Sequence, residues 1–452
     1  MYYCAHGAGS SQATAPNPRR HRDRRRTVHR LADNEPVTDP LAPLHAFAPL
    51  LTAEGRALLE EVRGTAPADE LAVATRLRRD HPADLVSAAL GQARLRQRAA
   101  AKFGAADAER MFFTPHGVEQ STRASVAAHR AARLKELGVA SLADLCCGIG
   151  GDAIALARAG IRVLAVDRDP VTAAAARANA AALGLDGLIE VREADVTDVD
   201  TSSYDAVFVD PARRGGRQGG ASRSEPVRGG GRATGGRIFD PEAYSPPLSW
   251  AVAAALKAPH AALKVAPGIP HEAVPPQAEA EWISDGGDVK EAVLWFGTEP
   301  GAVRATLLPG PHSLRGRGLP DPRVRPVGRY LYEPDGAVIR SHLVAEVAEA
   351  LDGGLLDATI AYVTADEARP TPYAAAYEIT DHLPFNVKKL KALLRERGVG
   401  TLTVKKRGSA VEPEELRRKV LPKPHGRGAV TVFLTRVAGA PAMLLGHPVR
   451  PA

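Results

Sequence analysis

Residues 144–152 (DLCCGIGGD) bring together two acids, two cysteines and three glycines. Gly148 and Gly150 let a ligand lie against bare main chain, because no Cβ stands in the way. Asp167 follows about twenty residues after the glycines, at the end of the run RVLAVD, where it can accept hydrogen bonds from both hydroxyls of a ribose. Asp195 ends a third run, GLIEVREAD, in a position suited to the amino group of an adenine. The pattern predicts a cofactor that contains a nucleoside.

The acid in front of the glycines distinguishes two such cofactors. A carboxylate at Asp144 would repel the pyrophosphate of a dinucleotide, whereas it would attract the ammonium group of a methionine moiety. The sequence therefore favours S-adenosylmethionine over NAD. We expect Cys146 and Cys147 to fill small, packed positions beside that moiety. No CxxC or HxxxH spacing is present, so we predict no metal site.

The elements that hold these residues alternate in type. Short apolar runs and alanine-rich helical stretches follow one another in the chain, which predicts βαβ units and a parallel sheet. Two later runs, KEAVLWFG and VRATLLPG, are predicted to form a hairpin through TEPGA at the sheet edge. We expect this domain to span residues 138–312. A disordered insertion should interrupt it at 213–237, where nine of 25 residues are glycine and seven are arginine.

Two further blocks flank this domain. Residues 1–36 predict a disordered basic tail, and apolar residues at helical spacing over 37–137 predict a helical N-terminal domain. Residues 325–445 mix helix and strand signals. From residue 381 onward the chain has 15 Lys and Arg against 5 Asp and Glu, a surplus of 10 that exceeds the net charge of +7. This concentration of charge is compatible with a polyanionic partner.

The overall composition is that of a globular protein, with 44% hydrophobic and 25% charged residues. The three cysteines form no framework of pairs, which indicates a reducing, cytoplasmic setting. No apolar run approaches the roughly 18 residues of a membrane span, so we expect a soluble protein without a membrane partner.

The run DLCCGIGGDAIALARAGIRVLAVDRDPVTAAAARANAAALG resembles the class I S-adenosylmethionine-dependent methyltransferases, in particular the trimethylguanosine synthases and their bacterial relatives. The preceding MFFTPHGVEQSTRASVAAHRA is similar to the segment ahead of the cofactor loop in that group. The C-terminal block resembles the THUMP-like domain of bacterial methyltransferases. The resemblance implies a Rossmann-like α/β sheet between an N-terminal helical domain and a C-terminal basic α/β domain. It also implies cofactor contacts from Asp144, Gly148, Gly150, Asp167 and Asp195, with Cys146 beside them.

By the same resemblance, methyl transfer is predicted at VFVDPARRGG (residues 207–216). In amino-methylating relatives this strand end has an acid or amide, two prolines and an aromatic residue. The acid and a main-chain carbonyl accept the hydrogens of the amine, and the aromatic ring stacks on the base. This chain has Asp210 and Pro211 but then Ala212 and Arg213. Arg213 either stacks on a base, grips a phosphate or is simply exposed.

An aromatic partner for the base would then come from RIFDPEAYSPP, as Phe239 or Tyr244. The DPAR sequence is also similar to the DPPR of 5-methyluridine synthases, which use a cysteine nucleophile. Cys146 and Cys147 belong to the cofactor turn and Cys4 lies in the predicted tail, so this chemistry is disfavoured.

We therefore expect methyl transfer from S-adenosylmethionine to a base of structured RNA, a tRNA or an rRNA. Lysines of FNVKKLK together with Lys405, Lys406 and Arg407 of TVKKRG are predicted to contact RNA phosphates. Two alternatives stay open. One is a small-molecule or protein methyltransferase in which the basic block is structural. The other is a non-catalytic RNA-binding protein that retains the cofactor fold.

Overall fold

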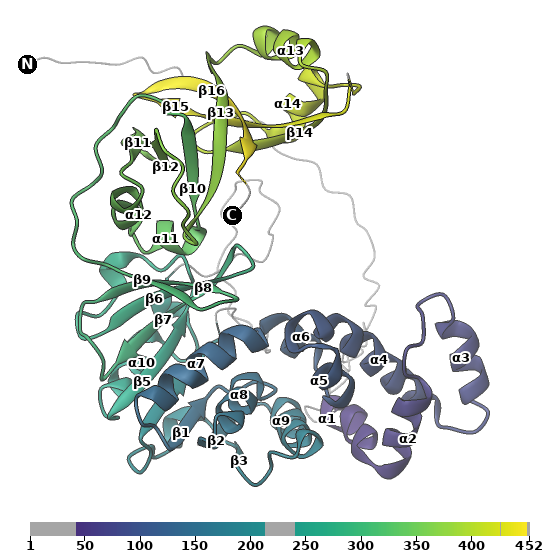
Figure 1. The fold of residues 1–452 in the computed structure, drawn as a ribbon. Helices are drawn as coiled ribbons and strands as arrows, with labels where there is room; N and C mark the ends of the chain where they lie inside the picture. Colours follow the sequence, from purple (N-terminus) through teal and green to yellow (C-terminus); the bar gives the residue numbers. More distant parts are fainter. Residues whose placement is uncertain (1–41, 213–239, 425, 450–452) are drawn as a thin grey trace, which may run out of the picture. The chain divides into compact units, whose positions relative to one another are not determined.

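The computed structural model describes residues 42–212, 240–424 and 426–449 (Figure 1). The predicted tail (1–36) and insertion (213–237) lie outside these residues, as do Arg213 and Phe239. The described residues from Pro43 onward belong to one compact unit. In those ranges, no helix combines the length and the apolar character that a membrane span requires.

Helices occupy the described chain ahead of the first strand. They are α1 (Ala42–Phe47), α2 (Ala53–Glu61), α3 (Glu70–Leu77), α4 (Ala83–Phe103), α5 (Ala105–Arg110), α6 (Pro115–Gln120) and α7 (Ala124–Glu136). The longest, α4, buries Val86, Ala89 and Ala93, which recur at helical spacing. It ends at Gly104, whose φ of 80° lies in the region that favours glycine.

A nine-stranded sheet follows, in the order β3-β2-β1-β4-β5-β7-β6-β8-β9. Its strands are β1 (Ser141–Leu145), β2 (Arg162–Asp167), β3 (Ile189–Glu193), β4 (Ala206–Val209), β5 (His260–Val265), β6 (Glu279–Asp285), β7 (Asp288–Phe296), β8 (Val303–Leu308) and β9 (His312–Arg315). The first five run parallel, and β7 is antiparallel to β5. The chain order reverses at β1, where β2 lies on one side and β4 on the other, and such a switch point is where ligands bind in α/β sheets.

Helices cover both faces of this sheet. Helices α8 (Gly151–Arg158) and α9 (Pro170–Leu183) share a hydrophobic core with Leu142 of β1, while α10 (Leu248–Ala255) packs on the other face with Ala143. Local sequence sets the ends of α9. The Asp169 side chain accepts a hydrogen bond from the Thr172 amide at 2.7 Å, and Gly184 ends the helix with a φ of 72°.

The predicted hairpin between KEAVLWFG and VRATLLPG is wrong. Strand β6 lies between β7 and β8, antiparallel to the first and parallel to the second. Neither β5 nor β6 was among the predicted strands. Both carry charged residues that interrupt the apolar pattern, namely Lys264 in β5 and Glu279 and Glu281 in β6. These residues form ion pairs with residues outside their own strands, as described below.

A second, seven-stranded sheet forms the C-terminal part, in the order β11-β12-β10-β13-β16-β15-β14. Its elements are β10 (Tyr330–Pro334), α11 (Gly336–Arg340), α12 (Val344–Ala350), β11 (Gly354–Asp357), β12 (Ile360–Ala365), β13 (Ala374–Pro384), α13 (Val387–Glu396), β14 (Val399–Lys406), α14 (Pro413–Val420), β15 (Gly428–Val437) and β16 (Ala440–Pro448). Only β14 and β15 pair in parallel among the described strands of this sheet. The predicted fold class, an α/β sheet between N-terminal helices and a C-terminal α/β domain, is confirmed.

The two sheets share one hydrophobic core. Trp282 and Leu294 of the first sheet belong to the same buried cluster as Ala337 and Val338 of α11 and Tyr332 of β10. All five are nearly inaccessible to solvent. The C-terminal part is therefore packed on the first sheet through apolar side chains.

Candidate functional site

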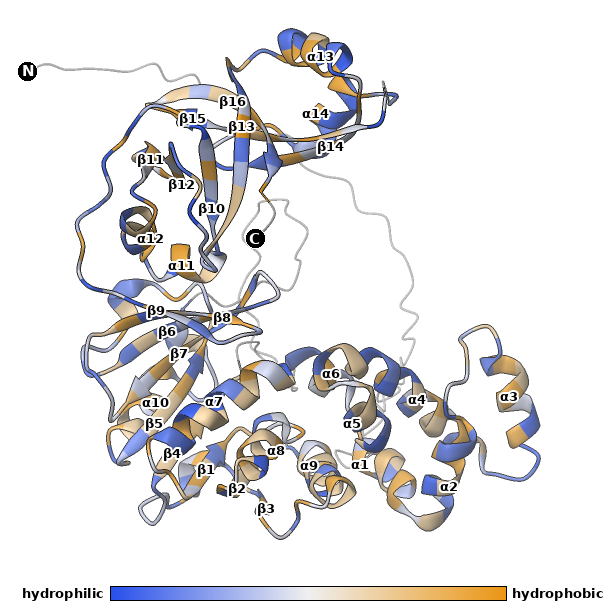
Figure 2. Cartoon of the chain, in the orientation of Figure 1, coloured by the Kyte–Doolittle hydropathy of each residue, from blue (hydrophilic) through white to orange (hydrophobic). Residues whose placement is uncertain are grey.

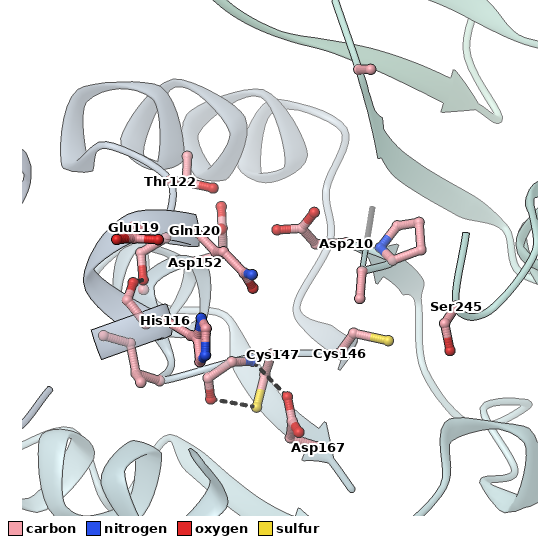
Figure 3. A pocket seen from close by; sticks show the side chains of 18 of the residues that line it. His116, Glu119, Gln120, Thr122, Cys146, Cys147, Asp152, Asp167, Asp210 and Ser245 are labelled. Carbon is pink, nitrogen blue, oxygen red and sulfur yellow. Dashed lines mark hydrogen bonds between the residues drawn. The ribbon is translucent and has the colours of Figure 1, made fainter. Parts of the chain in front are cut away.

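A cavity of about 1220 Å³ lies at the carboxyl ends of the parallel strands. Its wall includes the turn after β1, the residues that follow β2 to β5, and helix α6 with the residues after it. Six of the predicted site residues line it: Cys146, Gly148, Asp167, Asp195, Asp210 and Pro211. Figure 3 shows Asp210 and Asp167 on either side of the cysteine turn, as expected from strands that flank β1.

The turn after β1 offers bare main chain to this cavity. Cys146 has a φ of 65°, an uncommon value for a residue with a Cβ, and Gly148 follows with 58°. A Cβ built on Gly148 would meet no atom within 4 Å, so it would project into open space. Gly150 does not line the cavity. Its φ of 85° favours glycine, whereas a Cβ there would make only an ordinary contact with Ala176 of α9, at 3.6 Å. The backbone conformation rather than a lack of space therefore accounts for this glycine.

Asp167 ties the end of β2 to this turn. Its carboxylate accepts hydrogen bonds from the amides of Gly148 and Asp169, both at 3.0 Å. Burial raises the pKa of Asp167, and these two hydrogen bonds oppose the rise. Asp195 is exposed and accepts hydrogen bonds from the amide and hydroxyl of Thr197, which lower its pKa. Open space at Gly148 and carboxylates at two neighbouring strand ends fit a ligand that carries a ribose and a base.

Asp144 lies elsewhere than the sequence suggested. It is fully buried, does not line the cavity, and neither carboxylate oxygen has a hydrogen-bond partner. Burial raises its pKa well above the usual value, and the nearby carboxylates of Asp152 and Asp210 raise it further. The prediction that Asp144 contacts the ammonium group of a cofactor directly is therefore wrong. The reason is strand alternation, which turns Asp144 into the sheet face covered by α7 and α8.

Both cysteine thiols in the turn are uncharged groups. Burial raises the pKa of Cys146 and of Cys147, and the surrounding carboxylates act in the same direction. A neutral thiol behaves as a small apolar side chain, and Cys147 is buried while Cys146 is half-buried. Within the described ranges, no group of three or more His, Cys, Asp and Glu side chains is arranged to hold a metal ion.

Asp210 follows β4 and is paired with a buried lysine. The ammonium group of Lys264, on β5, donates to Asp210 Oδ2 at 2.6 Å and to Thr122 Oγ1 at 2.8 Å. Lys264 is only 3% exposed. Burial alone would lower the pKa of Lys264, but the carboxylates of Asp210, Glu291 and Asp152 outweigh burial and raise it. The lysine therefore stays charged and fixes Oδ2 of Asp210. The other oxygen, Oδ1, is left to accept a further hydrogen bond.

A second buried cation, Arg130, lies close to this pair. Arg130 of α7 is 1% exposed and forms ion pairs with Asp152 of α8 and Glu291 of β7. Its guanidinium also lies 4.4 Å from the centroid of the Phe208 ring, on β4. The two ion pairs and the ring contact of Arg130 thus join α7, α8, β7 and β4, which fixes these elements relative to one another.

The prediction that Tyr244 stacks on the base is also wrong. It is 3% exposed and belongs to the core beneath the sheet, so it cannot lie over the cavity. Its neighbour Ser245 lines the cavity and exchanges two main-chain hydrogen bonds with Ala212, at 2.9 and 3.1 Å. These bonds join the chain on the two sides of residues 213–239.

The three cations of TVKKRG lie on the second sheet and do not line the cavity. Lys405 pairs with Glu333, and Lys406 pairs with Glu412 at 2.6 Å. The guanidinium of Arg407 lies 5.2 Å from the centroid of the Tyr362 ring. Two of these three charges are therefore already compensated within the protein.

The other predicted lysine cluster is less compensated. Helix α13 buries Leu390 and Leu394 and exposes Lys388, Lys389, Lys391 and Arg395. Figure 2 shows that hydrophobic and hydrophilic residues both occur along this helix. In the part of the chain that the structure describes, no carboxylate forms a salt bridge with these four. Exposed, unpaired cations on one helix suit contact with phosphates.

Lys264, Thr122, Arg130 and Glu291 were missed in the sequence analysis. One signal was available: HAALKV, which forms β5, carries a lysine inside an otherwise apolar run. A lysine in a central strand is buried and must have a partner. The partner itself could not be inferred, because Thr122 and Asp210 lie on other elements.

Comparison with known families matches three segments of the chain. Residues 142–212 match a methyltransferase domain, residues 374–448 match a family described as THUMP domain-like, and residues 43–99 match a domain family of unknown function.

Relatives cover more of the chain. Two Mycobacterium tuberculosis proteins, from strains CDC 1551 and H37Rv, each named as an uncharacterized S-adenosylmethionine-dependent methyltransferase, are 33% identical over 369 residues. Each match spans 79% of this chain and 95% of the relative. A crystal structure of a putative methyltransferase from Porphyromonas gingivalis W83 shares the fold, with a TM-score of 0.66 at 20% identity. That match covers 85% of this chain and 99% of the other.

Proposed function

The chain belongs to the S-adenosylmethionine-dependent methyltransferases, and on that basis we propose that it methylates a base of structured RNA, a tRNA or an rRNA. The observation that carries the proposal is the pairing of two features in one compact unit. One is the acceptor carboxylate of Asp210 in the cavity of the glycine turn, and the other is a THUMP domain-like segment with unpaired cations on α13. The narrower likeness to trimethylguanosine synthases remains a prediction.

The cofactor would be held by the main chain at Gly148 and by the carboxylates of Asp167 and Asp195. S-adenosylmethionine supplies a methyl group on a sulfonium, which carries its own leaving group, so no strong acid or base is needed. Asp210 Oδ1 and a main-chain carbonyl would accept the hydrogens of an exocyclic amine and orient its lone pair. The rate enhancement then comes mainly from positioning.

The experiment is nucleoside mass spectrometry on total RNA from a strain that lacks the gene. We expect one methylated nucleoside to disappear and to return when the wild-type gene is supplied. The Asp210→Ala variant removes the acceptor oxygens, and we expect it to restore at most about a hundredth of the rate, a loss typical of a positioned polar group.

Tritium from labelled cofactor should then be followed into RNA, protein and metabolite fractions of the same strain. Label in the protein or metabolite fraction, together with an unchanged RNA profile, would contradict the proposal. Full complementation by Asp210→Ala would instead favour a non-catalytic protein.

A further inference from the structure

One wall of the cavity comes from the C-terminal part of the chain. Gly336 and Arg340, at the two ends of α11, line the cavity together with Val289 and Lys290 of β7. These residues are distinct from the glycine turn and from Asp167 and Asp195, to which the proposed cofactor contacts belong. This wall of the cavity is therefore built from the first sheet and from the C-terminal part of the chain.

Helix α11 is seated firmly on the first sheet. A Cβ built on Gly336 would lie 2.6 Å from Val289 Cγ2, so only a glycine allows this close approach. Just beyond the helix, the ring of His342 stacks on that of His271 with centroids 3.8 Å apart, and His271 stacks on Trp282 at 4.8 Å. These contacts, together with the shared apolar core, fix the position of the Arg340 main chain.

The Arg340 side chain is oriented by main-chain groups. Its Nη1 donates to the carbonyl of Pro267 at 3.3 Å, and a Cβ built on Gly268 would lie 3.5 Å from the same nitrogen. The guanidinium thus lies over the loop that follows β5 and lines the cavity. It is exposed, and no carboxylate of residues 42–212, 240–424 or 426–449 forms a salt bridge with it. Most of its five N–H donors remain available to a ligand.

Lys290 provides a second cation on this wall. It pairs with Asp288 at 3.1 Å, but the Asp288 side chain is 83% exposed, so water screens that pair. The cavity, at about 1220 Å³, is also larger than the roughly 300–1,000 Å³ of a typical small-ligand pocket. There is room for a nucleotide beside the cofactor.

We propose that Arg340, assisted by Lys290, binds a backbone phosphate next to the nucleotide that is methylated. The inference rests on the proposed RNA substrate. A guanidinium is a planar fork that matches two phosphate oxygens at once, whereas a lysine acts as a point charge. Phosphate contacts fix the position of a nucleic acid strand rather than its sequence. The C-terminal part thereby completes the acceptor site in addition to any RNA contact that it makes elsewhere.

The test compares wild type, Arg340→Gln, Arg340→Lys and the control Arg78→Gln, an exposed arginine at the end of α3. Binding of end-labelled bulk tRNA and of total rRNA fragments is measured by fluorescence anisotropy with the S-adenosylhomocysteine-loaded full chain, between about 50 and 200 mM salt. For Arg340→Gln we expect the slope of log K against log salt to fall by about one unit, with about tenfold weaker binding at low salt. Arg340→Lys should keep the slope and lose part of the affinity.

Three results would overturn the inference. The first is RNA binding by Arg340→Gln with the wild-type affinity and salt slope. The second is weaker binding of S-adenosylhomocysteine by calorimetry in both Arg340 variants, which would place the residue in the cofactor site. The third is loss of RNA binding to the same extent in Arg78→Gln. If wild type binds neither RNA while it binds S-adenosylhomocysteine, the proposed RNA substrate itself fails, and the inference falls with it.

Discussion

At the scale of single residues, the pair formed by Lys264 and Asp210 underlies the proposed acceptor site. An ammonium held at 2.6 Å limits the movement of the carboxylate, while the Thr122 hydroxyl fixes the lysine from the other side. The proposed acceptor carboxylate is therefore positioned before a substrate arrives. This arrangement suits a reaction that depends on the direction of a lone pair.

The strength of this pair can be measured without a substrate. Lys264→Met leaves Asp210 without its cation, and we expect the free energy of unfolding to fall by about 3 kcal/mol. Asp210→Asn leaves a buried ammonium unpaired and should also destabilise. The double variant removes both charges and should lose less than the sum of the two. Urea unfolding of the four proteins gives the coupling energy, and a value near zero would show that the two side chains act independently.

Residue spacing predicted part of this site and missed the rest. Asp167, Asp195 and Gly148 line the cavity, because glycine spacing and strand ends are local features. The prediction for Asp144 was wrong, because the sequence does not show that α7 and α8 cover the face of the sheet on which Asp144 lies. Lys264 was missed because its partners come from distant segments.

At the scale of elements, α7 and β6 are joined by buried ion pairs. Glu281 of β6 accepts hydrogen bonds at Oε2 from Arg133 at 2.9 Å and from Trp295 at 2.8 Å. Its Oε1 accepts a hydrogen bond from Thr306 at 2.6 Å and lies 2.9 Å from His129 Nε2. Burial alone would raise the pKa of Glu281. The hydrogen bond and charge of His129, with the charge of Arg133, outweigh burial and lower the pKa to about 2.

This lowered pKa predicts acid sensitivity. The unfolded chain binds a proton at Glu281 below about pH 4.5, whereas the folded chain does so only near pH 2. Its contribution, about 3 kcal/mol, is therefore present above pH 4.5 and is lost as the pH falls toward 2. Urea unfolding between about pH 3 and 6 should show a shallower pH dependence for Glu281→Gln. The control Glu349→Gln, in an exposed pair with Arg317, should follow wild type, and equal slopes in all three proteins would contradict the assignment.

The same ion pairs explain why the edge of the sheet was predicted wrongly. EAEWISD, which forms β6, alternates glutamates with apolar residues, a pattern typical of a strand with one side in water. Glu279 and Glu281 are instead 1% and 0% exposed, because Arg133 lies over them. A local pattern cannot show that a charge is compensated by a helix far away in the chain.

At the scale of the whole molecule, the shared core makes the two sheets depend on each other. Leu343 and Val347 of the C-terminal part are buried in the same cluster as Trp282 and Leu294. Removal of the C-terminal part would expose this surface to water, at a cost of about 25 cal/mol per Å² of apolar area. The sequence predicted a separate basic domain, since composition reveals charge but not which apolar faces meet.

We therefore expect the described unit to unfold in one cooperative step. Differential scanning calorimetry of the full chain should show a single transition, with matching calorimetric and van't Hoff enthalpies. S-adenosylhomocysteine should shift that whole transition upward. Two separate transitions, of which only one responds to the ligand, would show that the sheets fold independently.

The hydrogen bonds between Ala212 and Ser245 also bear on how this enzyme can be altered. They hold the main chain of Ala212, two residues from Asp210, against that of Ser245. The position of Asp210 therefore depends on a residue that lies more than thirty positions further along the chain. A substitution that displaces the main chain at Ser245 is expected to displace Asp210 as well.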